Sequence, residues 1–186
     1  NTKWLNTADQ LCQSMIKYFR DEDEGGFFFT ASDHEELVVR PRSHYDGSVP
    51  SGTSVATSVL LKLAKLTGKA EYLNLVEEIF SLYGPHFSRM PDQFANLLSC
   101  LDMYLFNGPE VAIALAGDEN DDMLFALHQK YYPNKVVAVA SDKAELEFLK
   151  DKKAIEQKTT VYICQNFTCA QPVNSLAELK ARISDW

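Results

Sequence analysis

Apolar side chains recur every three or four residues in three segments of the first 107 positions, residues 7–20, 70–83 and 91–106. This spacing is that of one face of an α-helix. Their apolar positions are Ala8, Leu11, Cys12, Met15, Ile16, Phe19, Tyr72, Leu75, Val76, Ile79, Phe80, Tyr83, Phe94, Leu97, Leu98, Leu101 and Leu105. Thr7 is suited to cap the first helix, and Pro91 to the first turn of the last. We therefore predict amphipathic helices that pack against one another.

A fourth segment, residues 53–68, has a different pattern. Up to Leu61 its side chains are small or apolar on all sides, and Lys62 and Lys65 appear only near its end. Such a composition is typical of a helix surrounded by other helices. Gly68 is suited to end it. One buried helix among amphipathic ones predicts a layered helical array, such as an inner ring inside an outer ring.

Between the first helix and the buried one, the pattern favours strands. Residues 27–31 and 37–40 are rich in aromatic and β-branched side chains, and a polar stretch, SDHEE, separates them. This arrangement predicts a β-hairpin with a charged tip at one end of the helical layer.

The pattern changes after the NGP sequence at residues 107–109. Short apolar runs at 109–117, 134–141 and 159–165 alternate with helix-like segments at 121–132, 143–151 and 175–183. Alternation of this kind predicts βαβ units with a small three-stranded parallel sheet. The expected fold is α+β overall, with a helical domain over residues 1–107 and a small α/β domain over residues 108–186.

Charge and cysteine content limit the classes of function. The net charge is −8 and the pI is near 5.0, which argues against partners that are nucleic acids or anionic membranes. No apolar run approaches the roughly 20 residues of a membrane-spanning helix, and the start of the chain does not resemble a signal peptide. Cys12 and Cys100 lie at apolar helical positions and are predicted to be buried thiols. We therefore expect a reducing, cytoplasmic location.

Polar residues before the buried helix form the candidate site. The candidate catalytic residues are Asp46, His34 and Glu35, and the candidate ligand-binding residues are Arg40, His44, Tyr45, Ser51 and Gly52. This group of polar and aromatic residues suits a sugar or polyol, because carboxylates bind hydroxyls and an aromatic side chain covers the face of a sugar ring. Asp46 is the candidate general acid or base, provided that burial raises its pKa.

A purely structural interpretation of the same residues stays open. Asp46 can cap a turn, Ser51 or Thr53 can cap the helix, and His34 with Glu35 can form a solvated tip. The spacing alone does not supply a second carboxylate on the opposite side of a glycosidic bond.

The pair Cys164 and Cys169 follows the last predicted strand. Zinc needs two further ligands, and the C-x4-C spacing differs from the C-x-x-C of redox dithiols. We interpret the pair as packed thiols in a turn, and we predict neither a metal site nor a cofactor.

Several motifs occur together in a fixed order: EGGFFFTASDHEELVVR, DGSVPSGTSVA, LAKLTGKAEYL, YYPNKVV and YICQNFTCAQPV. In this order they resemble the C-terminal part of a family of thioredoxin-domain-containing proteins. The resemblance covers essentially the whole chain. It implies a parent protein with an N-terminal thioredoxin-like domain and an (α/α)6 barrel of the six-hairpin glycosidase and epimerase type. This chain would hold the last hairpins of that barrel, an incomplete toroid, and a C-terminal α/β appendage.

The resemblance leads to two functional hypotheses. In the first, the chain is a fragment of a carbohydrate-binding or carbohydrate-processing barrel and is inactive in isolation. In the second, it is a non-catalytic interaction module that accompanies a thioredoxin-like domain. The positions that match the family motifs are Gly25, Gly26, Asp33, His34, Glu35, Arg40, Asp46, Gly47, Pro50, Ser51 and Gly52. Exposed faces of a partial barrel also predict self-association.

Overall fold

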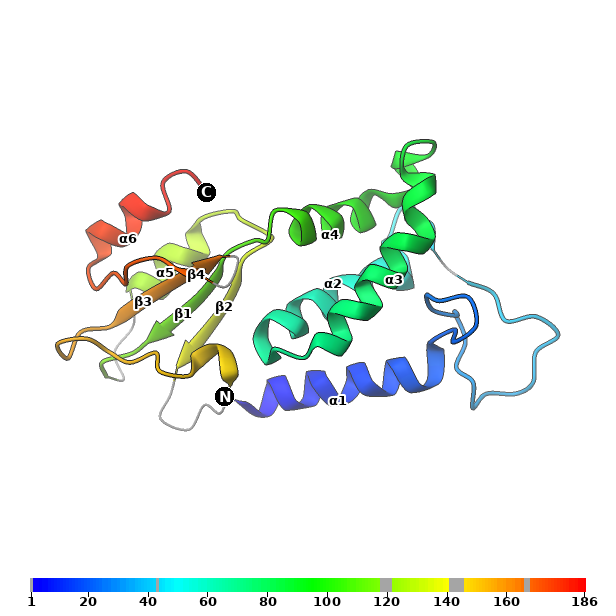
Figure 1. Cartoon of the computed structure of the whole chain (residues 1–186), viewed down its shortest axis with the longest axis horizontal. Coiled ribbons are helices and arrows are strands. Elements are labelled where there is room, and N and C mark those ends of the chain that lie inside the picture. The colour runs from blue at the N-terminus through cyan, green and yellow to red at the C-terminus, as the bar shows by residue number, and fades with distance from the viewer. Residues whose placement is uncertain (1, 43, 118–121, 141–145, 166–167) are drawn as a thin grey trace. The chain divides into compact units, whose positions relative to one another are not determined.

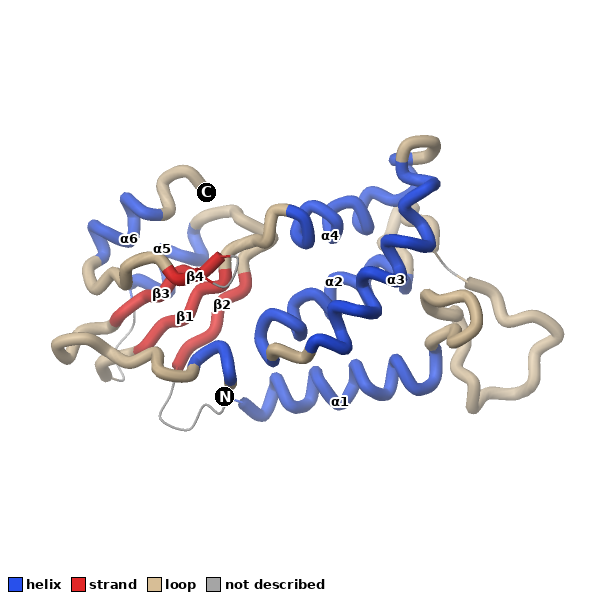
Figure 2. Tube along the Cα trace, viewed as in Figure 1, coloured by secondary structure: helices blue, strands red, loops and turns tan. Residues whose placement is uncertain are grey.

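The computed structural model describes residues 2–42, 44–117, 122–140, 146–165 and 168–186 (Figures 1 and 2). The chain divides into two compact units. The first comprises residues 1–64 and 68–105, and the second comprises residues 65–67 and 106–186. Helices dominate the first unit and a mixed sheet lies in the second, so the fold is α+β overall, as predicted.

The first unit is built on four α-helices and a 3-10 turn within the described residues. They are α1 (Thr2–Phe19), α2 (Gly52–Thr67), α3 (Ala70–Phe87), η1 (Pro91–Phe94) and α4 (Ala95–Leu105). The apolar face predicted for α3 is confirmed, because Tyr72, Leu75, Val76, Ile79 and Tyr83 are buried. The predicted cap at Thr7 is wrong. Helix α1 begins at Thr2, and the Thr7 hydroxyl donates to the carbonyl oxygen of Lys3 inside the helix.

Helix α2 begins and ends where the sequence predicts. The Ser51 hydroxyl accepts a hydrogen bond from the Ser54 N–H, and Gly68 ends the helix in the left-handed conformation with φ 72°. One face of α2 differs from the prediction of a helix surrounded on all sides. Val55 and Val59, one turn apart, are 46% and 37% exposed.

The predicted β-hairpin is replaced by a long loop between α1 and α2 (Figure 1). In the described part of this loop, only isolated bridges form, such as the one between Phe28 and Arg42, and the Phe29 N–H donates to the Pro41 carbonyl at 2.8 Å. Residues 37–39 pair with no strand among the described residues, and Val38 is fully exposed. High β-propensity therefore did not produce strands here, because β-propensity depends on packing against neighbouring strands.

The second unit contains a four-stranded mixed sheet of order β2-β1-β3-β4. Its elements are β1 (Glu110–Ala114), α5 (Asp122–Gln129), β2 (Val136–Ala140), η2 (Glu147–Leu149), β3 (Thr160–Gln165), β4 (Thr168–Cys169) and α6 (Leu176–Arg182). Strands β1 and β2 are parallel, but β3 is antiparallel to β1.

The prediction of a three-stranded parallel sheet is therefore wrong. The helix predicted over 143–151 is reduced, within the described residues, to the three-residue turn η2. Parallel pairing usually relies on a helical crossover, and the connection from β2 to β3 shows none in its described part. The first residues of that predicted helix lie outside the described residues.

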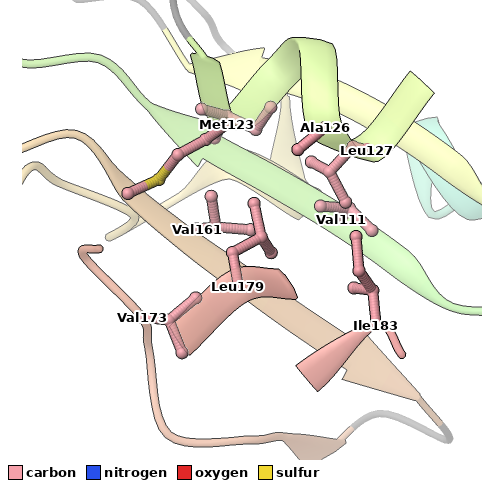
Figure 3. Packing of buried hydrophobic residues seen from close by; sticks show 9 residues of the cluster. Val111, Met123, Ala126, Leu127, Val161, Val173, Leu179 and Ile183 are labelled. Carbon is pink, nitrogen blue, oxygen red and sulfur yellow. The ribbon is translucent and has the colours of Figure 1, made fainter. Parts of the chain in front are cut away.

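Helices α5 and α6 pack on one face of the sheet (Figure 3). Val111 and Ile113 are two positions apart on β1, so their side chains point to the same side of the sheet. The cluster consists of Val111, Ile113, Met123, Ala126, Leu127, Val161, Val173, Leu179 and Ile183. This apolar layer is the core of the second unit.

Candidate functional site

The Asp46 carboxylate links the starts of two helices in the first unit. Its Oδ1 accepts hydrogen bonds from the Ser51 N–H at 2.8 Å and the Ser54 hydroxyl at 2.6 Å, before and within α2. Its Oδ2 accepts from the N–H groups of Asn96 and Leu97 at 2.8 and 3.2 Å, in the first turn of α4. One side chain thus satisfies backbone donors that a helix start leaves without partners.

These hydrogen bonds also determine the protonation of Asp46. Burial acts to raise the pKa of its carboxyl, but the hydrogen bonds from Ser54, Ser51, Leu97 and Asn96 outweigh it and hold the pKa below 3.8. An acid or base role near neutral pH needs a raised pKa, which is the opposite shift. The geometry therefore matches the structural alternative for Asp46.

The other proposed catalytic residues lie on the exposed loop. Asp33, His34 and Glu35 are exposed, and no hydrogen bond or ion pair within the described residues joins His34 or Glu35 to Asp46. Ser51 caps α2, and Gly52 is its exposed first residue. Asp46, Ser51 and Gly52 thus lie at the start of α2, whereas His34 and Glu35 lie on a solvent-exposed loop.

Arg40 anchors the base of that loop. Its guanidinium donates to the carbonyl oxygens of Tyr18 and Thr30, at 3.2 and 2.7 Å, and lies 4.0 Å from the centre of the Phe28 ring. These contacts use the planar guanidinium for several partners at once. In this structure the predicted ligand-binding arginine holds the loop against the end of α1.

His44 and Tyr45 belong to an aromatic cluster. The His44 ring lies 4.1 Å from the Tyr45 ring, 5.1 Å from Tyr83 and 6.5 Å from Phe94, measured between ring centres. Tyr45 is 48% exposed, whereas Tyr83 and Phe94 are buried. The sequence placed Tyr83 and Phe94 on apolar helix faces but gave no signal that they meet His44.

An ion-pair network not anticipated from the sequence lies beside this cluster. Asp21 is 4% exposed, and its Oδ1 accepts from the N–H groups of Asp23 and Glu24 while its Oδ2 pairs with Arg42. Glu24 also pairs with Arg42, at 2.7 Å. Burial acts to raise the pKa of Asp21, but the hydrogen bonds from Glu24, Asp23 and Arg42 lower the pKa by more, so the net shift is downward. The available signal was the acidic run before two glycines.

Two of the cysteine predictions can be compared with the structure. Cys12 and Cys100 are buried, as predicted, and burial raises the pKa of each thiol to about 11. Cys164 and Cys169 form a disulfide, so their interpretation as packed free thiols is wrong. Cys164 on β3 and Cys169 on β4 stand opposite each other in the antiparallel pairing of these strands. The C-x4-C spacing alone does not reveal this pairing.

Within the described ranges, no group of three or more His, Cys, Asp or Glu side chains is arranged to hold a metal ion. Among those ranges, too, every helix is too short or too polar to cross a membrane.

The position of His44 in the aromatic cluster should make the stability of the first unit depend on pH. Burial lowers the pKa of His44, and the charges of Arg42 and His86 lower it further. Between 6.5 and the lower folded pKa, the unfolded chain therefore binds a proton that the folded chain does not, so stability falls as the pH drops below about 6.5. We expect the urea midpoint of the first unit to decrease over this range.

The matching measurement is urea unfolding between pH 7.5 and 5.0, followed by circular dichroism. His44→Gln should flatten the slope, whereas His128→Gln, at an exposed position of α5, should leave it unchanged. Equal slopes for the wild type and His44→Gln would contradict the assignment.

Curated proteins similar to this chain support the resemblance seen in the motifs. Spermatogenesis-associated protein 20 of Rattus norvegicus is 27% identical over 188 residues, which cover 96% of this chain and 24% of that protein. The protein of the same name from Homo sapiens is 25% identical over 186 residues, with 95% and 24% covered. Uncharacterized protein B0495.5 of Caenorhabditis elegans is 26% identical over 162 residues, with 83% and 22% covered.

The chain is therefore homologous to the C-terminal region of spermatogenesis-associated protein 20. It spans about a quarter of the length of the curated relatives that it matches. No protein-family model matches the chain. The thioredoxin-like domain and the barrel architecture of the parent protein stay predictions.

Proposed function

We propose that this chain is a non-catalytic structural and interaction module of a longer protein. The observation that carries the proposal is the hydrogen bonding of Asp46. Both oxygens of the most plausible catalytic carboxylate are used to start α2 and α4, and its pKa is lowered. A carboxylate in this role organises the fold of the first unit and is not poised for proton transfer.

The interaction surface is the segment Leu37–Val39 of the long loop, here called the docking segment. Leu37, Val38 and Val39 are 39%, 103% and 72% exposed. The loop that carries them is fixed at its base by the Arg40 contacts and by the hydrogen bond from the Ser32 N–H to the Tyr18 carbonyl, at 2.8 Å. An apolar segment on an anchored base is presented to a partner at a reduced cost in conformational entropy.

The occupant that we assign to the docking segment is another part of the same longer protein. The support is the coverage of the relatives, since about three quarters of their length has no counterpart in this chain. Contiguous exposed apolar residues are typical of a surface that a further domain covers.

The proposal can be tested with a photo-activated cross-linking residue in place of Val38 in the full-length protein that carries this chain. We expect an intramolecular cross-link from position 38 to a residue outside the 186 present here, identified by mass spectrometry. Cross-links only to a second copy, only to another protein, or to solvent would each contradict the proposal. The same residue in place of the exposed Phe125, in the second unit, is the matched control.

The isolated chain should self-associate through the uncovered docking segment. Replacing Leu37, Val38 and Val39 together by Ser removes the exposed apolar surface, and we expect the self-association constant to fall at least about tenfold, or ~1.4 kcal/mol. Analytical ultracentrifugation over a concentration series measures this constant. Phe125→Ser should leave it unchanged, and a wild-type chain that stays monomeric would contradict the prediction.

Carbohydrate binding is the second candidate function, and the half-exposed ring of Tyr45 is the observation that favours it. An exposed aromatic face beside polar loop residues suits the apolar face of a sugar. Titration of the full-length protein with a panel of mono- and disaccharides tests it. Binding that Tyr45→Ala abolishes would support this candidate, and an absence of binding to the whole panel would end it.

A further inference from the structure

The Cys164–Cys169 disulfide lies at one edge of the mixed sheet, and its two halves differ in accessibility. The pair stands directly opposite in the register of β3 and β4, and β4 is the edge strand. Cys164 is 4% exposed, whereas Cys169 is exposed. The disulfide thus joins a buried residue to an exposed residue at the edge of the sheet.

We propose that this disulfide is a reversible thiol-exchange site, with Cys169 as the sulfur that an external thiolate attacks and Cys164 as the leaving thiolate. The co-reactant is a thiol of the glutathione or dithiol class. The proposal does not depend on the docking segment, which lies in the other unit.

The exchange conserves atoms and electrons. The external thiolate forms a bond to Cys169 Sγ while the Cys164–Cys169 bond breaks, and its electron pair leaves on Cys164 Sγ, which then takes up a proton. A second thiolate attacks the external sulfur of the mixed disulfide and releases Cys169 as a thiolate. Two external thiols are oxidised to a disulfide, and the protein disulfide is reduced to two thiols.

The surrounding sheet keeps its pairing when the bond opens. The Ala170 N–H donates to the Ile163 carbonyl at 2.9 Å, and Val161 and Val173 exchange two backbone hydrogen bonds of 2.8 and 3.0 Å. Val173 is also part of the buried core of the second unit. The strand after Cys169 thus stays on the sheet without the disulfide, so that opening is local and the bond can form again.

The remaining cysteines serve as internal controls. Cys12 and Cys100 are 2% and 5% exposed, and burial raises their thiol pKa to about 11. Few thiolates form at such positions near neutral pH, and access is blocked as well. Modification of the folded chain should therefore report on Cys164 and Cys169 alone.

The test uses the full chain with oxidised glutathione, and intact-mass spectrometry follows the adducts. In Cys164→Ser, we expect one glutathione adduct at Cys169. In Cys169→Ser, the adduct at Cys164 should form at least about tenfold more slowly, because that sulfur is buried. Equal rates for the two variants, or faster reaction at Cys164, would overturn the assignment of the attacked sulfur.

The wild-type chain provides the second readout. After reduction by a dithiol, Cys169 should be alkylated without denaturant and Cys164 at least about tenfold more slowly, and removing the dithiol under air should restore the bond with an unchanged circular dichroism spectrum. Four free thiols in the air-equilibrated chain, or loss of the folded spectrum on reduction, would overturn the proposal of a reversible site. The variant Cys12→Ser is the control for this experiment. Because the Cys12 thiol is buried, its removal should leave the reduction and reoxidation of the disulfide as in the wild type.

Discussion

Gly108→Ala is expected to destabilise the second unit by about 3 kcal/mol or more, which is a large fraction of the roughly 5–15 kcal/mol that stabilises a typical domain. A Cβ atom at this buried position would lie 2.2 Å from the Asn134 carbonyl oxygen and 2.8 Å from the Asn134 carbonyl carbon. These neighbours are backbone atoms, so no side-chain rotation relieves the clash. Moving them would disturb the start of β2, where the Val136 N–H donates to the Pro109 carbonyl at 3.0 Å.

The measurement needs a probe of the second unit alone. Trp186 packs against Tyr132 with ring centres 5.4 Å apart, and Trp4 lies in the first unit, so a Trp4→Phe background leaves fluorescence that reports on the second unit. Urea unfolding of Gly108→Ala in that background should show a lowered midpoint or no folded baseline. Gly117→Ala is the matched control, because nothing lies within 4 Å of a Cβ there, and its midpoint should stay within about 0.5 kcal/mol of the parent. Equal stability of the two variants would show that the backbone can adjust at Gly108.

Local patterns predicted most elements of this chain because each pattern reflects burial on one face. The face of α3 and the ends of α2 at Ser51 and Gly68 follow directly from such patterns. The direction of β3 does not, since it depends on how the chain returns after β2. The loop at residues 37–39 has the composition of a strand but lacks a neighbouring strand in the described part of the chain. Sequence patterns thus describe a segment's own preference and not its partners.

The candidate site shows the same limit. The sequence offered both a capping and a catalytic role for Asp46, because both roles suit a carboxylate before a helix. The choice depends on Asn96 and Leu97, whose N–H groups lie 50 and 51 positions further along the chain. Likewise, the disulfide depends on the register of β3 and β4, and the His44 cluster depends on where α3 and η1 pack. Each of these features arises from tertiary contacts that no spacing rule encodes.

Asp46→Ala should destabilise the first unit by about 1–4 kcal/mol, because the loss of a helix cap costs about 0.5–2 kcal/mol and this carboxylate serves two helix starts. Asp46→Asn should cost less, since its single carbonyl oxygen can still accept from one of the two helices. Because the pKa of Asp46 is lowered in the folded chain, the ionised carboxylate stabilises the fold above pH 3.8. This stabilisation is lost as the pH falls through the pKa of Asp46 in the folded chain. The difference between wild type and Asp46→Ala should therefore shrink in strong acid.

Urea unfolding followed by circular dichroism measures these free energies, with Asp33→Ala at an exposed loop position as the control that should change little. The experiment also separates the two roles considered for Asp46. A capping carboxylate changes stability whether or not any ligand is present. If Asp46→Ala unfolds at the wild-type urea midpoint, the four hydrogen bonds contribute nothing to the fold, and the carboxylate would then need another reason to be held in this position.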